Sequence, residues 1–139
     1  MINEKDIHKR IAEMLKGAGF NVIASEIAEG FKKPAVFVNV YPASITLLNA
    51  DMESVTDTVE IRYIPSVETV EECADKAQKL RRLFMYKPFD VGSRHLTIPS
   101  IEFDIDGYIL YAYFDISYQQ ETPDGEEYET MENLKIGGI

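Results

Sequence analysis

Apolar residues near the N-terminus recur at the spacing of one face of an α-helix. These residues are Ile7, Ile11, Met14, Leu15 and Ala18. Asn3 precedes them and belongs to a residue type that caps helix N-termini, whereas Gly17 and Gly19 favour a helix end. The pattern predicts an amphipathic helix between these signals.

A second stripe of apolar residues at helical spacing begins near residue 70. Its members are Val70, Cys73, Ala74, Ala77, Leu80 and Phe84. Either Ser66 or Thr69 is the predicted N-cap, and Thr69 with Glu72 has the spacing of a capping box. Pro88 lies beyond the expected helix end.

Several stretches have the two-residue period, or the apolar character on both faces, of β-strands. Residues 35–41 read AVFVNVY and predict a central strand, and residues 21–24 predict a short one. Residues 52–64 predict a strand with one mostly apolar face. That face comprises Val55, Asp57, Val59, Ile61 and Tyr63.

The C-terminal half contains a hairpin signal. Asp106-Gly107 separates the runs HLTIPSIEFDI and YILYAYFDISYQQ, and Asp-Gly suits a type I′ turn with positive φ at both central residues. We expect loops over 25–34 and 87–94. The element order contains no repeated βαβ unit. It predicts the α+β class, with an antiparallel or mixed sheet of four to five strands and two helices packed on one face.

Length and composition indicate a single domain over residues 1–139. Of these residues, 45% are hydrophobic and 27% are charged, as is usual for a globular chain. We expect residues 120–132 to form a mobile acidic arm, because this stretch is rich in carboxylates, has no basic residue and contains Pro123 and Gly125.

The formal net charge of −10 disfavours binding to free nucleic acid. Residues 76–87 oppose this sign, with Lys76, Lys79, Arg81, Arg82 and Lys87. No apolar run reaches the roughly 18 residues that span a bilayer, and the first ten residues are too charged for a secretory signal. One cysteine cannot form an internal disulfide. We therefore expect a cytosolic protein with no membrane partner.

The sequence contains no recognisable catalytic set, metal site or cofactor motif. His8 lies beside basic residues on the first predicted helix, His95 begins a strand, and Cys73 belongs to the apolar stripe of the second helix. We interpret all three as structural or surface residues. Zinc would require more Cys or His ligands at short spacing. We predict no catalytic residue, no metal and no cofactor.

The segment SEIAEGFKKPAVFVNVY, residues 25–41, resembles the phage tail terminator family of Gram-positive phages and prophages. The similarity rests on a motif formed by Glu26, Ile27, Gly30, Phe31 and Pro34. It continues through Tyr63-Ile64-Pro65, the helix that begins Glu71-Glu72-Cys73, the Asp106-Gly107 hairpin and MENLKI at 131–136. Nearly the whole chain is covered.

The resemblance implies a structural, non-enzymatic subunit that completes the phage tail. Such a subunit forms a ring, typically a hexamer, on the head-proximal end of the tail tube. It stops tube polymerisation and docks the head–tail connector protein, while DNA only passes through the lumen. We expect it in the host cytoplasm during assembly and later in the virion tail.

A ring of identical subunits needs a heterologous interface, in which one patch meets a different patch on the neighbour. Charge suggests candidates for the two patches. The basic candidates are Lys76, Lys79, Arg81 and Arg82, and the acidic candidates are Glu126, Glu127 and Glu129. Acidic residues at 51–60 and 121–132 would also let DNA pass a ring lumen without sticking.

Two other interpretations remain open. One is a related head-completion or tail-assembly component, which would differ mainly in its binding partner. The other is a small ligand-binding module or an enzyme of unknown substrate, which would require an apolar cavity with convergent polar groups between helices and sheet.

Overall fold

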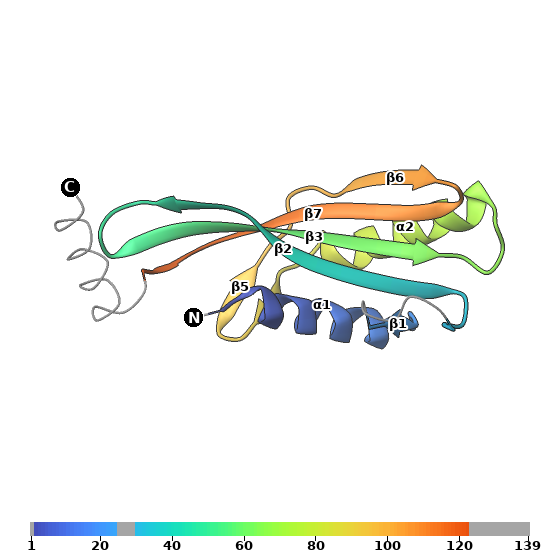
Figure 1. The fold of residues 1–139 in the computed structure, drawn as a ribbon, viewed down its shortest axis with the longest axis horizontal. Coiled ribbons are helices and arrows are strands. Elements are labelled where there is room, and N and C mark those ends of the chain that lie inside the picture. The colour runs from blue at the N-terminus through green and yellow to red at the C-terminus, as the bar shows by residue number, and fades with distance from the viewer. Residues whose placement is uncertain (1, 25–29, 123–139) are drawn as a thin grey trace.

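The computed structural model describes residues 2–24 and 30–122 (Figure 1). Two helices and seven strands lie in this part of the chain. They are α1 (Glu4–Gly17), β1 (Val22–Ile23), β2 (Ala35–Leu47), β3 (Met52–Ile64), α2 (Val70–Phe84), β4 (Phe89–Val91), β5 (Arg94–Leu96), β6 (Glu102–Asp106) and β7 (Ile109–Glu121).

Five strands form one sheet in the order β1-β2-β3-β7-β6. Strand β1 runs parallel to β2, and the other neighbours are antiparallel, so the sheet is mixed. Strands β4 and β5 form a separate antiparallel pair. The predicted α+β class is confirmed, and of the predicted alternatives, an antiparallel or mixed sheet of four to five strands, the structure has the mixed sheet with five.

The core lies on one face of the sheet. The apolar face predicted for β3, which includes Asp57, is buried along its length. Inward side chains of α1 and α2, such as Ile11 and Leu80, join β3 and β7 residues in the same hydrophobic cluster. Both helices therefore cover the same face, as the sequence predicts.

Helix α1 begins as its sequence predicts. The Asn3 side chain accepts a hydrogen bond from the Asp6 N–H (3.0 Å), and the Asp6 carboxylate accepts one from the Asn3 N–H (3.1 Å). This reciprocal pair satisfies two backbone donors that a helix end would otherwise leave without partners. Ile7, Ile11 and Leu15 are fully buried.

Helix α2 departs from its prediction in two respects. Thr69 is the N-cap, but the capping box is only half formed: the Thr69 hydroxyl oxygen accepts from the Glu72 N–H, whereas the Thr69 N–H bonds to the Val67 carbonyl. The buried stripe is also narrower than predicted, because Val70 and Ala74 are exposed. At about 100° per residue, Ala74 lies roughly 100° from the centre of the arc that holds the buried residues.

Strand β2 extends beyond the predicted residues 35–41. It runs to Leu47, and the register against β3 shifts between Pro42 and Ser44. Proline has no N–H to donate to a neighbouring strand, and a bulge accommodates that loss. The prediction stopped at Tyr41 because the apolar run ends there, and the residues that continue the strand are mostly exposed.

Residues 87–94, predicted to be a loop, contain most of the β4–β5 hairpin. Gly92 has a φ of +60° in its two-residue turn, a conformation that favours glycine. Phe89, Val91 and Leu96 of this hairpin are buried. Strands of three residues are too short to show a period in the sequence, which explains the error.

The β6–β7 hairpin is confirmed, but its turn is shifted by one residue. Asp106 pairs with Ile109, so the central residues are Gly107 and Tyr108 rather than Asp106 and Gly107. Their φ values are +58° and +62°, as a type I′ turn requires. Tyr108 thus holds a backbone conformation that non-glycine residues seldom adopt.

Replacing Tyr108 with asparagine is expected to stabilise the protein by about 0.5–1 kcal/mol, because asparagine tolerates positive φ better than tyrosine does. Gly107→Ala, at the other central residue of the turn, should instead destabilise the protein by about 1 kcal/mol or more, because alanine disfavours positive φ. Urea unfolding of both variants measures the difference. Equal stabilities for the two would contradict the type I′ turn.

Candidate functional site

The basic residues of α2 separate into two groups. Lys76 and Lys79 line a pocket between the start of β2 and the helices. Arg81 instead donates a hydrogen bond to the Tyr86 hydroxyl (2.8 Å), and Arg82 is exposed outside the pocket lining. The sequence predicts one basic patch for these four residues, whereas the helix places them on two different sides.

The pocket, which we call the lysine pocket, has a volume of about 320 Å³. Its lining combines four lysines with an apolar floor. The lysines are Lys32, Lys33, Lys76 and Lys79, and the floor includes Phe20, Val36, Pro34 and Tyr63. The Lys79 Nζ atom lies 4.7 Å from the centre of the Phe20 ring, and the Phe20 ring packs edge-on against Tyr63. The sequence does not predict that Lys32 and Lys33 join this pocket, because they lie far from α2 in the chain and no motif connects the two segments.

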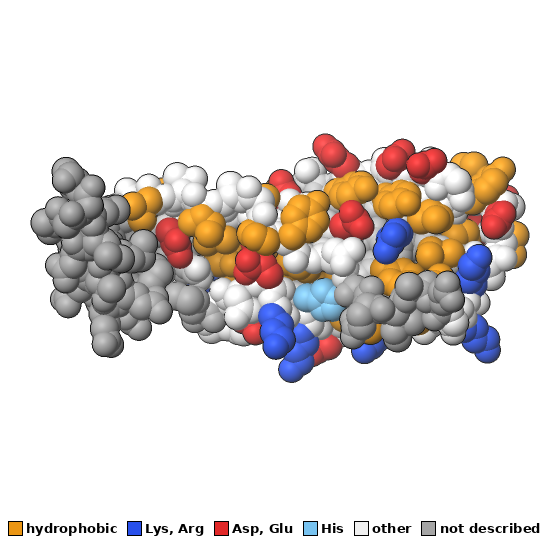
Figure 2. Space-filling model, viewed as in Figure 1, with side chains coloured by type: hydrophobic (Ala, Val, Ile, Leu, Met, Phe, Trp, Pro, Cys, Tyr) orange, Lys and Arg blue, Asp and Glu red, His pale blue; other side chains and the backbone are white. Residues whose placement is uncertain are grey.

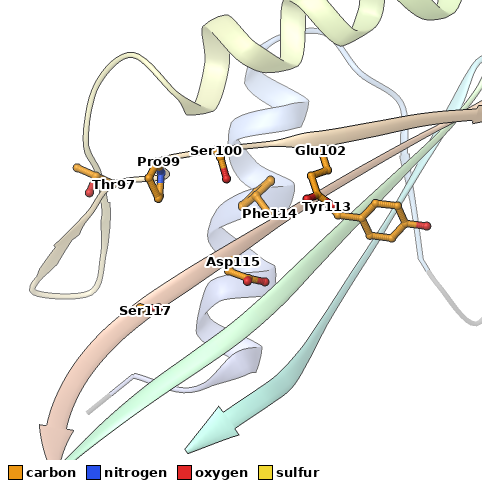
Figure 3. Close-up of a pocket in the computed structure, with 8 residues that line it drawn as sticks. All are labelled: Thr97, Pro99, Ser100, Glu102, Tyr113, Phe114, Asp115 and Ser117. Atoms are coloured by element: carbon orange, nitrogen blue, oxygen red, sulfur yellow. The ribbon is translucent and has the colours of Figure 1, made fainter.

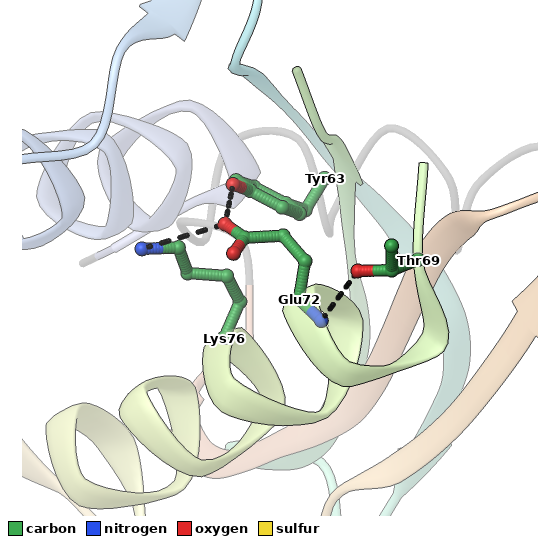
Figure 4. Close-up of polar contacts among 4 residues, drawn as sticks. All are labelled: Tyr63, Thr69, Glu72 and Lys76. Atoms are coloured by element: carbon green, nitrogen blue, oxygen red, sulfur yellow. Dashed lines mark hydrogen bonds and ion pairs between the residues drawn. The ribbon is translucent and has the colours of Figure 1, made fainter. Parts of the chain in front are cut away.

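Glu72 contacts two residues of the pocket lining, Tyr63 and Lys76 (Figure 4). Its carboxylate accepts a hydrogen bond from the Tyr63 hydroxyl (2.8 Å) and lies 3.9 Å from the Lys76 ammonium. Burial, and then the hydrogen bond to Glu72, raises the pKa of Tyr63 above its usual range. Tyr63 therefore stays protonated and helps to hold Glu72 in place beside Lys76.

The opposite face of the sheet is acidic and aromatic. Outward residues of β3, β6 and β7 include Glu60, Glu102 and Asp104, which pair across strands with Tyr113 and Tyr111. Figure 2 shows acidic side chains distributed among hydrophobic ones along these strands. The described residues contain no group of three Asp, Glu, His or Cys side chains arranged to hold a metal ion.

A hollow of about 510 Å³ lies beside β7, where β6 begins (Figure 3). Glu102 and Asp115 contribute carboxylates to its lining, and Tyr113 lies between β6 and β3. Asp115 accepts a hydrogen bond from the Thr58 hydroxyl (2.8 Å). The lining contains no histidine, cysteine or lysine.

One end of the sheet projects beyond the helices. Figure 1 shows the β2–β3 turn and the end of β7 together at this end, away from α2 and β1. Ile45 and Leu47 are 62% and 64% exposed there, and Leu48 is also exposed. We call the end formed by residues 44–56 and 116–122 the projecting strands.

Asp57 lies at the base of the projecting strands and is fully buried. One oxygen accepts a hydrogen bond from the Tyr118 hydroxyl (3.2 Å), and the other has no partner among the described residues. Burial, reinforced by the charge of Glu4, raises the pKa of Asp57 to about 6, although the Tyr118 bond opposes this shift. The alternation of residues in the sequence had placed Asp57 on the apolar face of β3, which is the buried face.

The phage tail terminator family model matches residues 6–129 of the chain. The chain belongs to the phage tail terminator protein family. That membership makes it a structural tail-completion protein associated with the virion tail. Within the motif first noticed in the sequence, Phe31 packs edge-on against Phe37 at 5.1 Å, whereas Glu26 and Ile27 lie outside the described residues.

Comparison with individual proteins gives no information on function beyond the family match. One solved structure, whose title states no function, aligns with 89% of this terminator and 99% of its own chain at 13% identity and a TM-score of 0.48. No curated protein matches the chain. The family match therefore carries the functional conclusion.

The residues considered for chemistry have structural partners in this tail terminator. His8 lies 3.0 Å from the Val38 carbonyl, although the sequence suggested a solvent-facing side chain. His95 forms an exposed ion pair with Asp90. Cys73 is buried and donates to the Tyr108 carbonyl (3.3 Å), and burial raises the pKa of its thiol. A thiol with a raised pKa is a poor nucleophile.

Neither of the two described helices has the length and apolar character needed to cross a membrane. The acidic candidates Glu126, Glu127 and Glu129 and the MENLKI segment lie outside the described residues. Most of the predicted acidic arm also lies outside them. Of its described residues, 120 and 121 belong to β7 and 122 follows directly after it.

Proposed function

We propose that this protein assembles into a ring, with a hexamer as the expected form, on the head-proximal end of the tail tube. There it stops tube polymerisation and docks the head–tail connector protein. Its partners are further copies of itself, the tube protein and the connector, met in the host cytoplasm during assembly. The match of the tail terminator family over residues 6–129 carries this proposal.

The projecting strands support self-assembly. Exposed Ile45, Leu47 and Leu48 place apolar area at a protruding end, where a monomer gains nothing from it. Among the described residues, β1 pairs only with Val36 and Phe37 of β2, so the outer edge of β2 has no strand partner beyond them. Apolar area beside an unpaired strand edge favours contact with another chain.

The acidic face of the sheet supports passage of DNA without binding. Glu60, Glu102 and Asp104 lie on this face, and the cation Arg62 lies on it too, opposite Tyr111. In a ring whose lumen is lined by this face, like charge repels the phosphate backbone. A predominantly basic lumen in an imaged ring would overturn this part of the proposal.

Light scattering during size-exclusion chromatography, over a series of protein and salt concentrations, tests the proposal. We expect association toward a ring-sized species, with rings visible by negative-stain electron microscopy. If the protein remains monomeric throughout, capture by assembled tail tube becomes the deciding measurement. Failure to associate both alone and on the tube would overturn the proposed function.

The variant Ile45→Ser/Leu47→Ser should weaken ring assembly roughly tenfold or more, because it removes apolar area that an interface would bury. Its unfolding free energy should change by only about 0.5 kcal/mol, since both side chains are mostly exposed. Val67→Ser/Val70→Ser is the matched control, because these valines are similarly exposed near α2. Equal assembly of both variants would remove the projecting strands from the interface.

A further inference from the structure

The lysine pocket concentrates positive charge on a strongly acidic protein. Lys32 and Lys33 reach it from the segment before β2, and Lys76 and Lys79 from successive turns of α2. Within the described residues, Glu72 is the one carboxylate in ion-pair contact with any of them. Among the described residues, four lysines against one carboxylate leave a net positive lining that suits an acidic ligand.

The floor of the pocket restricts the ligand further. Pro34 supplies exposed apolar surface in the lining, whereas Phe20, Val36 and Tyr63 lie beneath it and are only 8%, 1% and 2% exposed. A peptide that carries both carboxylates and an apolar side chain would use the lysines and this proline together, because the two recognise different parts of it.

The chain itself contains such a peptide. Residues 121–132 read ETPDGEEYETME and hold six carboxylate side chains, no basic residue and one tyrosine, Tyr128. The segment starts at the end of β7, where Thr122 bonds to Asp51 and Ala50 in the β2–β3 turn. Its starting point is therefore fixed at the tip of the projecting strands.

Distance excludes docking of the central glutamates into the pocket of the same chain. Met52 pairs with Glu121 at one end of β3, and Tyr63 lines the pocket at the other end. At ~3.3 Å per residue these ends lie about 36 Å apart. From Thr122, a fully extended chain reaches only about 14 Å to Glu126 and about 24 Å to Glu129.

We propose that the acidic segment 121–132 of one subunit docks in the lysine pocket of the neighbouring subunit. The inference rests on the proposed ring. Each subunit then offers a pocket at one end and an acidic segment at the other, which is the head-to-tail arrangement that a closed ring requires. Glu126, Glu127 and Glu129 meet Lys32, Lys33, Lys76 and Lys79, and Tyr128 packs against the exposed Pro34 of the lining.

A charge exchange between two full-length variants tests this pairing. The pocket variant is Lys76→Glu/Lys79→Glu, and the tail variant is Glu126→Lys/Glu127→Lys. Each alone should assemble roughly tenfold less well than the unaltered protein at low salt, because like charges then meet at every interface. Mixed in equal amounts they should assemble again, because an alternating ring pairs opposite charges at every junction.

Arg81→Glu/Arg82→Glu is the matched control, since it changes the net charge equally on the same helix outside the pocket. It should assemble like the unaltered protein. Assembly of either exchanged variant alone, equal loss in the control, or no recovery on mixing would overturn the inference while leaving the ring intact. Circular dichroism and melting of each variant separate loss of folding from loss of pairing.

A peptide titration decides the matter independently of ring formation. Adding a synthetic peptide of residues 121–132 to the full-length monomer at low concentration should shift the NMR signals of Phe20, Lys76 and Lys79, and a peptide with every Glu and Asp replaced by its amide should not. No shift with the acidic peptide would overturn the inference. If the peptide shifts these signals but no ring assembles, the proposed ring is wrong and the pairing of segment and pocket stands.

Discussion

Replacing Asp57 with asparagine is expected to stabilise the protein at neutral pH and to leave its stability near pH 4 almost unchanged. Asp57 is fully buried against Tyr118, with one oxygen that has no partner among the described residues. Above its pKa, folding has to bury a charge at that position. Asparagine keeps the shape and the hydrogen bond to Tyr118 without the charge.

The pH window follows from the shift in pKa. The pKa of Asp57 is about 6 in the folded protein, against an ordinary value of 3.8. Between these values the folded state binds more protons than the unfolded state. The stability that the protonated Asp57 contributes is therefore fully present below about pH 4 and is lost as the pH rises through about 6. At about 1.4 kcal/mol per pKa unit the ceiling is near 3 kcal/mol, and relaxation of the structure around the buried charge lowers the expected loss to about 1–2 kcal/mol.

Two groups shift the pKa of Asp57 besides its burial, and a third lies against one of them. Glu4 of α1 raises its pKa, Tyr118 of β7 lowers it, and Arg94 of β5 lies over the Tyr118 ring at 5.7 Å. Urea unfolding between pH 4 and 8 measures the effect. Asp115→Asn, at an exposed position, is the control and should follow the unaltered protein. An Asp57→Asn curve parallel to that of the unaltered protein at every pH would contradict the buried carboxylate.

The sequence predicted the elements whose signals are local. The cap at Asn3, the phase of β3 and the existence of the β6–β7 hairpin each depend on residues close together in the chain, and each is confirmed. The placement of Asp57 on the buried face followed from the same two-residue period. Its raised pKa did not follow, because the period says nothing of Glu4 or of solvent.

Features that depend on distant residues could not be predicted. The lysine pocket brings residues 32–33 to α2 through the fold of β2, and no short motif marks that meeting. The β4–β5 hairpin is stabilised by contacts with α2 and the sheet rather than by its own pattern. The extension of β2 past Pro42 depends on its register with β3, which restores pairing after the bulge.

Phe84→Ala is expected to cause the largest loss of stability, about 3–5 kcal/mol, because it empties space at the junction of three elements. The Phe84 ring is fully buried on α2 and lies 6.2 Å from Phe89 of β4 and 5.3 Å from Phe114 of β7. Such a loss is a large part of the stability of a small domain. Urea unfolding of the variant measures it.

The same substitution tests how the β4–β5 hairpin is held. Amide hydrogens of Val91 and Leu96 should exchange faster in Phe84→Ala, whereas those in the centre of β3 should keep their order of protection, because loss of the ring first loosens the segment that packs on it. Tyr86→Ala, two residues on and mostly exposed, is the matched control and should change stability by only about 0.5 kcal/mol. A similarly small change for Phe84→Ala would mean that helix, hairpin and sheet do not share one packed core at this position.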